Sequence, residues 1–271
     1  MDIALTYYKI FDKEFYLKNY PHFDKDSSKN ELFFHWLQNG KKFNYIINQE
    51  QAIRRFKIGL EHAEKLIEMT HYKPNCDIVF NILIRTSCRP EYFNNCIQSI
   101  LNQTFKGKVN VFVTYDNKET QEYLKKYLHV IKAFKMESNK DYGFNLYCNN
   151  LLQKVEYGWI IILDDDDQFL SNGALEIISS YIKRDNQLII WNFLRPDRIV
   201  KPKEEFVFSE IDTTCFCFNN KYKNKSYWKA ERGSDFFYFD NLGRVPDLKK
   251  KFINLVLTRT IYNDRIANYG N

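Results

Sequence analysis

The sequence predicts an α/β fold: a mainly parallel sheet flanked by helices, with a small helical N-terminal extension. Two observations support it. From residue 77 onward, strand patterns alternate with helical patterns, and the strand at 159–163 is apolar at every position. Such alternation is typical of parallel sheets, and a continuously apolar strand is typical of one buried on both faces. With 271 residues, of which 44% are hydrophobic, the chain can bury a large core.

The composition disfavours several classes of protein. The formal net charge is +6, and Lys249-Lys250-Lys251 is the one compact basic run, so nucleic acid is not an expected partner. The six cysteines form no CxxC pair that would indicate zinc. No signal peptide and no apolar stretch of ~18 residues are visible, so we expect no membrane span. A cytoplasmic location is expected, which would be that of a host cell if the AT-rich composition reflects a virus.

Residues 1–72 are predicted to form the helical extension and a connector helix, and residues 73–271 the main domain. Short helices are expected at 12–20, stopped by Pro21, and at 29–37, closed by Asn39-Gly40. Apolar residues at helical spacing predict the connector over 48–71.

The main domain is predicted to begin with a strand at 78–84. Arg89 and Pro90 then open a helix, since proline suits the first helical turn. Further strands are expected at 109–113, 130–134, 159–163, 188–194 and 213–218. Further helices are expected at 119–128, 144–155, 172–183 and near 234–242.

Asp164, Asp165, Asp166 and Asp167 directly follow the apolar strand 159–163. Ligands of open α/β sheets bind beyond the carboxyl ends of the strands, where this run would lie. Like charges ~4 Å apart repel by about 4 kcal/mol at an effective dielectric near 20, so a cation is the natural partner. Carboxylate clusters suit Mg²⁺ or Mn²⁺ shared with substrate phosphates. A solvated acidic turn is the alternative, which the buried strand disfavours.

Several runs in order resemble GT-A glycosyltransferases, family 2 in particular. Residues 84–90 (IRTSCRP) and 96–105 (CIQSILNQTF) resemble the strand, Thr- and Arg-containing loop and helix that open these enzymes. The resemblance implies that Thr86 and Arg89 contact the nucleotide. Asp116, after the second strand, matches an acidic residue that contacts the base, although Asp is also an ordinary turn residue.

Later runs extend the resemblance over residues 77–271. Asn149 matches a residue lining the nucleotide-sugar pocket, although a helix offers an asparagine many other uses. The LDDDD run resembles the family's metal motif, which places Asp164 and Asp165 at the nucleotide and Asp166, with Asp164, at the metal. Asp235, in a Gly-Ser-Asp run, takes the place of the general base. A helix cap is its alternative, with Glu231 and Asp212 as the next candidate bases.

The resemblance implies an inverting, metal-dependent glycosyltransferase that uses a nucleotide-diphosphate sugar, UDP-linked, with Mn²⁺ or Mg²⁺. The acceptor class stays open between glycan, protein and lipid, and the aromatic-rich N-terminal segment offers a contact for an oligomer. Two alternatives remain: an inactive GT-A-fold scaffold, and a nucleotidyltransferase. The second would usually open with a Gly-rich phosphate loop, and residues 86–90 contain no glycine.

Overall fold

The computed structural model describes residues 3–20, 23–40, 45–137, 141–195 and 198–260. The chain divides into two compact units, one reaching to His62 and the other beginning at Ala63. The domain boundary predicted between residues 72 and 73 stays a prediction.

The first unit is a small helical module with an aromatic core. It contains α1 (Ile3–Ile10), α2 (Lys13–Asn19), α3 (Lys29–His35), a π-helical turn (Trp36–Gly40) and the start of α4 (Gln49–Glu68). Asp12 caps α2 and Ser28 caps α3 through a capping box with Glu31, which explains why both helices begin where expected. Phe11, Tyr16 and Trp36 are buried together. The helix α1 was not predicted.

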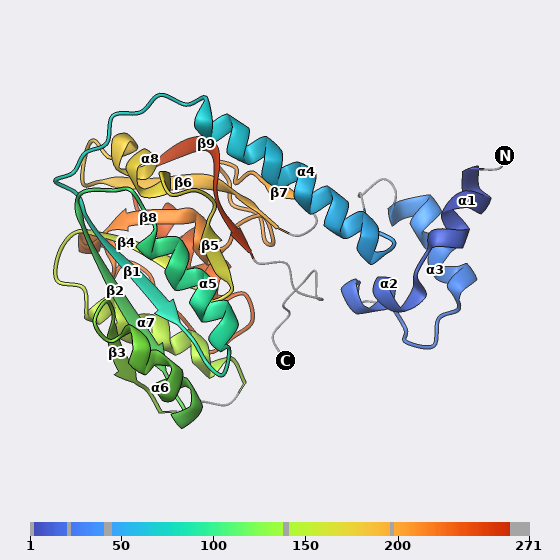
Figure 1. Ribbon diagram of the computed structural model, residues 1–271, viewed down its shortest axis with the longest axis horizontal. Helices are drawn as coiled ribbons and strands as arrows, with labels where there is room; N and C mark the ends of the chain where they lie inside the picture. Colours follow the sequence, from blue (N-terminus) through green and yellow to red (C-terminus); the bar gives the residue numbers. More distant parts are fainter. Residues whose placement is uncertain (1–2, 21–22, 41–44, 138–140, 196–197, 261–271) are drawn as a thin grey trace. The chain divides into compact units, whose positions relative to one another are not determined.

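The second unit is built on one sheet, drawn in Figure 1, with the strand order β3-β2-β1-β4-β8-β6-β9-β5 and β7 paired to β6. Strands β3, β2, β1 and β4 are parallel, whereas β8 runs antiparallel between β4 and β6. The strand bounds are β1 Val79–Arg85, β2 Lys108–Tyr115, β3 Lys132–Lys135, β4 Trp159–Asp164, β5 Asp167–Phe169, β6 Gln187–Leu194, β7 Ile199–Val200, β8 Phe216–Asn219 and β9 Lys249–Thr260. The predicted α/β fold with a mostly parallel central sheet is confirmed.

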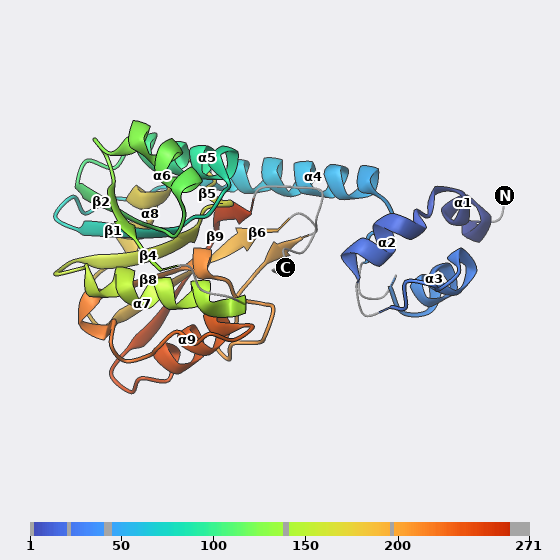
Figure 2. The same ribbon diagram turned by 90° about the horizontal axis from the view of Figure 1, so that it is seen from below.

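Helices cover both faces of this sheet, as Figure 2 shows: α7 and α9 lie on one side, and α5 and α8 on the other. Their bounds are α5 Pro90–Leu101, α6 Lys118–Leu124, α7 Leu146–Gln153, α8 Ala174–Tyr181 and α9 Ser234–Gly243. Because helices cover both faces, β1 and β4 are buried along nearly their whole length. The sheet therefore presents its polar groups at the strand ends.

Several segments of the second unit differ from the predicted elements. Residues 213–215 form a 3₁₀ turn, and only Phe216–Asn219 continue as the strand β8. Strand β9 was not predicted, and it inserts between β6 and β5. The short strand β5 was also missed, although it contains Asp167, the last aspartate of the acidic run.

Gln103 joins the end of α5 to the start of α8. Its amide nitrogen donates to the carbonyls of Ser99 and Ser171 at 2.9 and 2.8 Å, and its amide oxygen accepts from the Leu175 N–H at 2.9 Å. Thr104 adds a backbone bond of 2.8 Å to Asn172. The run 96–105, which resembles family 2, thus meets the segment 171–175, and the contact fixes the chain just after the aspartates.

We expect Gln103→Ala to lower the free energy of unfolding by about 1–3 kcal/mol, because it leaves partly buried backbone groups without partners. Urea unfolding followed by circular dichroism measures this change. Gln121→Ala is the matched control, since Gln121 is exposed on α6 and should change stability by less than about 0.5 kcal/mol. Equal losses in the two variants would contradict this role for Gln103.

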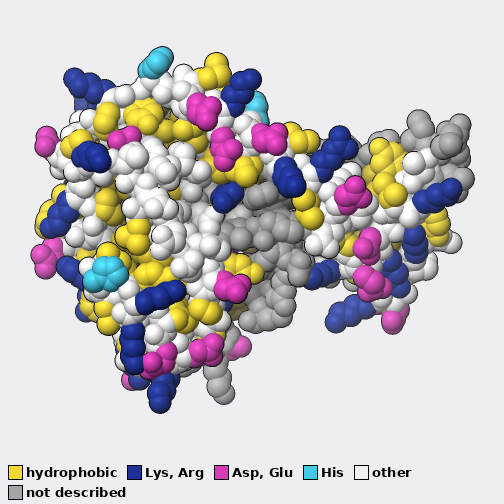
Figure 3. Space-filling model, in the orientation of Figure 1, with side chains coloured by type: hydrophobic (Ala, Val, Ile, Leu, Met, Phe, Trp, Pro, Cys, Tyr) yellow, Lys and Arg dark blue, Asp and Glu magenta, His cyan; other side chains and the backbone are white. Residues whose placement is uncertain are grey.

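The face shown in Figure 3 carries basic and acidic side chains interspersed. Within the described part of the chain, no helix is long and apolar enough to cross a membrane. The six cysteines are all free thiols.

Candidate active site

Arg85 and Asp164 pair across the carboxyl ends of two parallel strands. They are register partners at the ends of β1 and β4. The guanidinium donates to both carboxylate oxygens, from Nε to Oδ1 at 2.6 Å and from Nη2 to Oδ2 at 2.9 Å. Burial would raise the pKa of Asp164, but this bidentate partner outweighs burial, so the pKa lies below its usual value. Asp164 is therefore ionised and fixed in place.

The Arg85 side chain is fixed by aromatic rings and by a hydrogen bond as well as by Asp164. Its side chain is only 13% exposed, and its guanidinium lies over the rings of Phe144 and Trp228 at 5.2 and 5.4 Å from their centroids. Its Nη1 donates to Asn145 Oδ1 at 2.6 Å, and the Asn145 amide donates to the Glu231 carbonyl at 2.9 Å. This network links the acidic run to the loop that precedes α9.

The loop after β1 contacts the next two aspartates. Thr86 Oγ1 donates to Asp165 at 2.6 Å. The Arg89 guanidinium bonds Asp165 through Nε at 3.1 Å and through Nη2, and its Nη1 lies 3.2 Å from Asp166. The structure therefore brings together five of the predicted site residues, namely Thr86, Arg89, Asp164, Asp165 and Asp166.

Cys88 makes the turn that directs Arg89 back over the aspartates. Its φ of 51° lies in the left-handed region, which is uncommon for a residue other than glycine. The Cys88 N–H donates to Thr120 Oγ1 at 2.8 Å, which holds this turn against α6.

Asp116 lies beside the same loop. One carboxylate oxygen accepts from Ser87 at 3.0 Å and from Asn117 at 2.7 Å, and the other accepts from the Tyr147 hydroxyl at 3.2 Å. Asp116 is partly exposed, and the oxygen that accepts from Tyr147 can accept a further bond. It is thus oriented at the edge of the site and still accessible.

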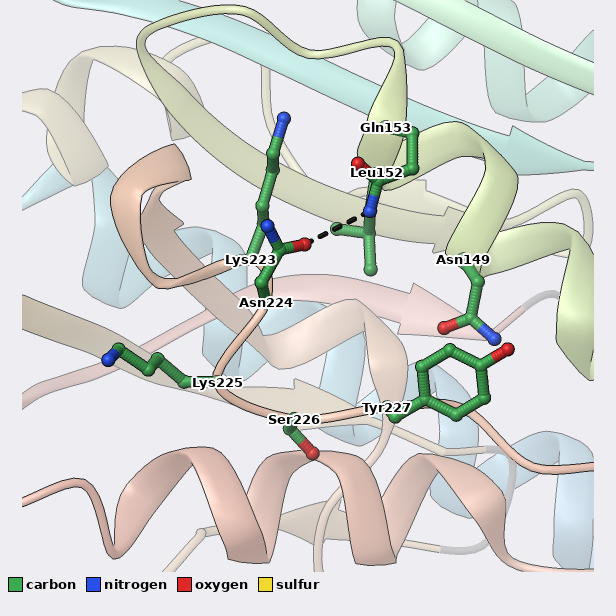
Figure 4. Close-up of a pocket in the computed structure, with 8 residues that line it drawn as sticks. All are labelled: Asn149, Leu152, Gln153, Lys223, Asn224, Lys225, Ser226 and Tyr227. Carbon is green, nitrogen blue, oxygen red and sulfur yellow. Dashed lines mark hydrogen bonds between the residues drawn. The ribbon is translucent and has the colours of Figure 1, made fainter.

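Asn149 has a different environment from the other predicted residues. Its amide donates to the Trp228 carbonyl at 2.9 Å and accepts from the Trp228 N–H at 3.0 Å. It also lines a cavity of about 380 Å³ beside the 223–227 loop, drawn in Figure 4, which contains none of the other predicted site residues. The structure gives Asn149 a role in holding Trp228 and does not bring it to the aspartates.

Asp235 lies in the first turn of α9. Gly233 precedes it with a φ of 73°, and Ser234 Oγ accepts from the Lys229 N–H at 2.8 Å, so the helix start is rigidly formed. Burial, followed by the nearby charge of Asp212, raises the pKa of Asp235 to about 6, whereas Arg85 opposes the rise. A carboxylate with such a pKa suits a general base near neutral pH.

The site carries more negative than positive charge. Burial, reinforced by neighbouring carboxylates and opposed by Arg89, raises the pKa of Asp165 to about 7 and also raises that of Asp166. Burial and Asp212 raise the pKa of Asp167 well above its usual value, although Asp167 accepts a bond from Thr260 at 3.0 Å. A bound cation would relieve this repulsion.

The carboxylates do not form a complete metal cage. Among the described residues, no three His, Cys, Asp or Glu side chains come together as a ligand set for a metal ion. Mg²⁺ and Mn²⁺ are commonly held by one or two carboxylates plus substrate phosphates, and such a shared site needs no cage. The donor set therefore fits a metal that binds together with a diphosphate.

An acidic run at the end of a buried parallel strand, facing a Thr- and Arg-containing loop, defines the GT-A class of fold and site. Residues 82–242, more than half of the chain, match the Glycosyl transferase family 2 model. The chain belongs to this family. No curated protein matches it in sequence.

Solved structures of similar fold include proteins from S. aureus and Pyrobaculum calidifontis. S. aureus TarS superposes with a TM-score of 0.55 at 15% identity, covering 68% of this chain and 37% of TarS. TarS 1–349 in complex with UDP-GlcNAc gives 0.51 at 14%, covering 69% and 59%. The mannosyltransferase PcManGT from Pyrobaculum calidifontis, in complex with GDP-Man and Mn²⁺, gives 0.51 at 8%, covering 77% and 65%. This chain thus spans less than two thirds of each of these proteins.

Sequence reasoning missed Arg85 and Asn145 as site residues. Arg85 is the one charged residue of a largely apolar strand, and such a residue must find a partner at the sheet edge. That signal was available. Asn145 gave no signal, because its role depends on contacts with β1 and with the loop before α9.

Proposed function

We propose that this protein transfers a sugar from a nucleotide-diphosphate sugar, UDP-linked, to an acceptor hydroxyl with inversion at the anomeric carbon. The observation that carries the proposal is the convergence of Arg85, Thr86 and Arg89 with the aspartates at the carboxyl ends of β1 and β4. Family membership supports the reaction class. The complexes of similar structures with UDP-GlcNAc and GDP-Man support a nucleotide-sugar donor.

Different residues of the chain bind the nucleotide and take the proton of the acceptor. Arg89, at the start of α5, offers hydrogen-bond donors to the nucleotide diphosphate, while Thr86, in the loop before it, holds Asp165 beside the nucleotide. Asp235 takes the proton of the acceptor hydroxyl as that oxygen attacks the anomeric carbon and the nucleoside diphosphate leaves. Mn²⁺ or Mg²⁺, held by Asp166 with Asp164 as a second candidate, would neutralise negative charge on the leaving diphosphate.

Release of free UDP from a panel of UDP-sugars, measured with and without Mn²⁺, tests this function. Metal-dependent release that increases with an added acceptor supports it. Binding of UDP without turnover of any donor would favour an inactive scaffold that retains the fold. Release of pyrophosphate from a nucleoside triphosphate and a sugar phosphate would favour a nucleotidyltransferase.

Asp116 is expected to make the site prefer UDP over CDP. A carboxylate can accept the N3–H of uracil, whereas cytosine has no proton at that position. A hydrogen bond to a charged partner contributes about 1.5–3 kcal/mol, so UDP should bind roughly ten- to a hundredfold more tightly.

Competition binding of UDP and CDP measures this preference. Asp116→Asn is the informative variant, because its amide can turn to pair with cytosine and should reduce the preference. Glu119→Gln, which removes a carboxylate from the exposed start of α6, is the matched control. Equal affinity of the unaltered protein for the two nucleotides would remove Asp116 from the base site.

A further inference from the structure

The two arginines of the site differ in how firmly they are held. Arg85 is 13% exposed and is held by Asp164, Asn145 and two aromatic rings. Arg89 is 40% exposed, and besides bonding the aspartates its guanidinium lies 5.9 Å from the centroid of the Tyr92 ring. Arg85 is thus a fixed counterion of the acidic run, whereas Arg89 can reorient without unpacking the core.

Arg89 also covers the carboxylates that a metal would need. It bonds both Asp165 and Asp166. Asp166 is the aspartate best suited to bind a metal, because both oxygens of Asp164 are taken by Arg85. A divalent cation arriving alone must therefore displace a guanidinium from carboxylates that are more than nine-tenths buried. This competition weakens binding of the metal by itself.

A nucleotide diphosphate changes the competition between Arg89 and a cation for Asp166. Arg89 immediately precedes the first residue of α5, and a helix start of this kind attracts phosphate. A guanidinium can form paired hydrogen bonds to phosphate oxygens, just as it does to a carboxylate. Arg89 can then pair with the diphosphate, which releases Asp166 to the cation.

We propose that Arg89 is a positioning residue that occupies the metal-binding carboxylates until the nucleotide draws it away, so that metal binds tightly only together with nucleotide. This inference rests on the proposed metal-dependent function. It assigns to one side chain the part of the cooperativity between metal and nucleotide that exceeds their direct contact. Because coupling between two ligands is reciprocal, the same residue makes UDP binding depend on the metal.

Titration of the full chain with Mn²⁺, followed by calorimetry and by the electron paramagnetic resonance signal of free Mn²⁺, tests the inference. The coupling factor is the ratio of the Mn²⁺ dissociation constants without and with saturating UDP. In the unaltered protein this factor should be large. In Arg89→Met, Mn²⁺ alone should bind about ten- to a hundredfold more tightly, the gain expected from removing a charge-assisted contact. The coupling factor should fall by a similar ratio, to the part that direct contact between the metal and the diphosphate provides.

Two further variants sharpen the test. Arg89→Lys keeps the charge without the fork and should retain a coupling factor well above that of Arg89→Met. Arg244→Met removes an arginine on the exposed side of the same unit, where it pairs with Asp240, and should leave the coupling factor unchanged. This control separates a local effect from the general loss of one positive charge. Thermal unfolding of each variant checks that it is folded.

The outcomes distinguish the inference from the proposed function. Tight Mn²⁺ binding by the unaltered protein without UDP, or an unchanged coupling factor in Arg89→Met, overturns the role of Arg89 alone. Absence of Mn²⁺ binding by every variant, even with UDP, overturns both this role and the metal-dependent function.

Discussion

Replacing Asp235 by Asn is expected to lower sugar transfer by about 10²–10⁴-fold while UDP and Mn²⁺ binding persist. General-base catalysis typically contributes this factor, and asparagine nearly preserves the shape of the side chain while removing the proton acceptor. Initial rates of transfer, together with calorimetric binding of UDP, separate the two effects. Asp240→Asn, on the same helix, is the matched control and should retain transfer.

The pH dependence of the reaction gives an independent check on Asp235. Burial raises its pKa to about 6, and the base acts only when it is ionised. The value of kcat/KM should therefore rise with pH up to about 6 and level off above it. If Asp235→Asn transfers sugar at the full rate, Asp235 is a helix-start residue only, and Asp212 or Glu231 becomes the candidate base.

Replacing Asp166 by Ala is expected to abolish the gain in UDP affinity that Mn²⁺ provides. Asp166 lies among the clustered carboxylates of the site. Unlike Asp164, it is not bound in bidentate fashion by Arg85. Without its carboxylate, the remaining affinity should equal that of the unaltered protein in the presence of a chelator. Calorimetric titration of UDP with Mn²⁺ and with chelator measures both values.

Asp185→Ala is the control for the loss of one carboxylate, because Asp185 is exposed between α8 and β6. It should keep the full Mn²⁺ effect. A full Mn²⁺ effect in Asp166→Ala would transfer the ligand role to Asp164 or Asp165, and would show that the acidic run is shifted by one residue relative to the family's motif.

The sequence predicted those parts of the fold that leave a local pattern. The apolar run 159–163 and the four aspartates marked a buried strand and a polar strand end, and both lie as expected. Strand β9 escaped prediction because it begins with three lysines, and only pairing with β6 and β5 makes it a strand. Strand β5 has three residues and carries no periodicity to detect.

The same distinction applies to the candidate site. Thr86 and Arg89 were predicted because residues 84–90 resemble the loop that opens family 2 enzymes, and the structure places both residues in contact with the aspartates. Asn145 contacts Arg85, 60 positions before it, and the Glu231 carbonyl, 86 positions after it. No spacing rule encodes such a contact, since it depends on how α7 and the loop before α9 pack.

The Asn145 bridge has a consequence for redesign of this enzyme. The Asn145 side chain steadies Arg85, and through it Asp164, and it also anchors the loop leading to Asp235. Under the proposed function, we therefore expect donor specificity and acceptor specificity to change together. A library that varies residues 228–233 to accept a new acceptor should be screened for donor affinity as well, and Asn145 should be kept constant in it.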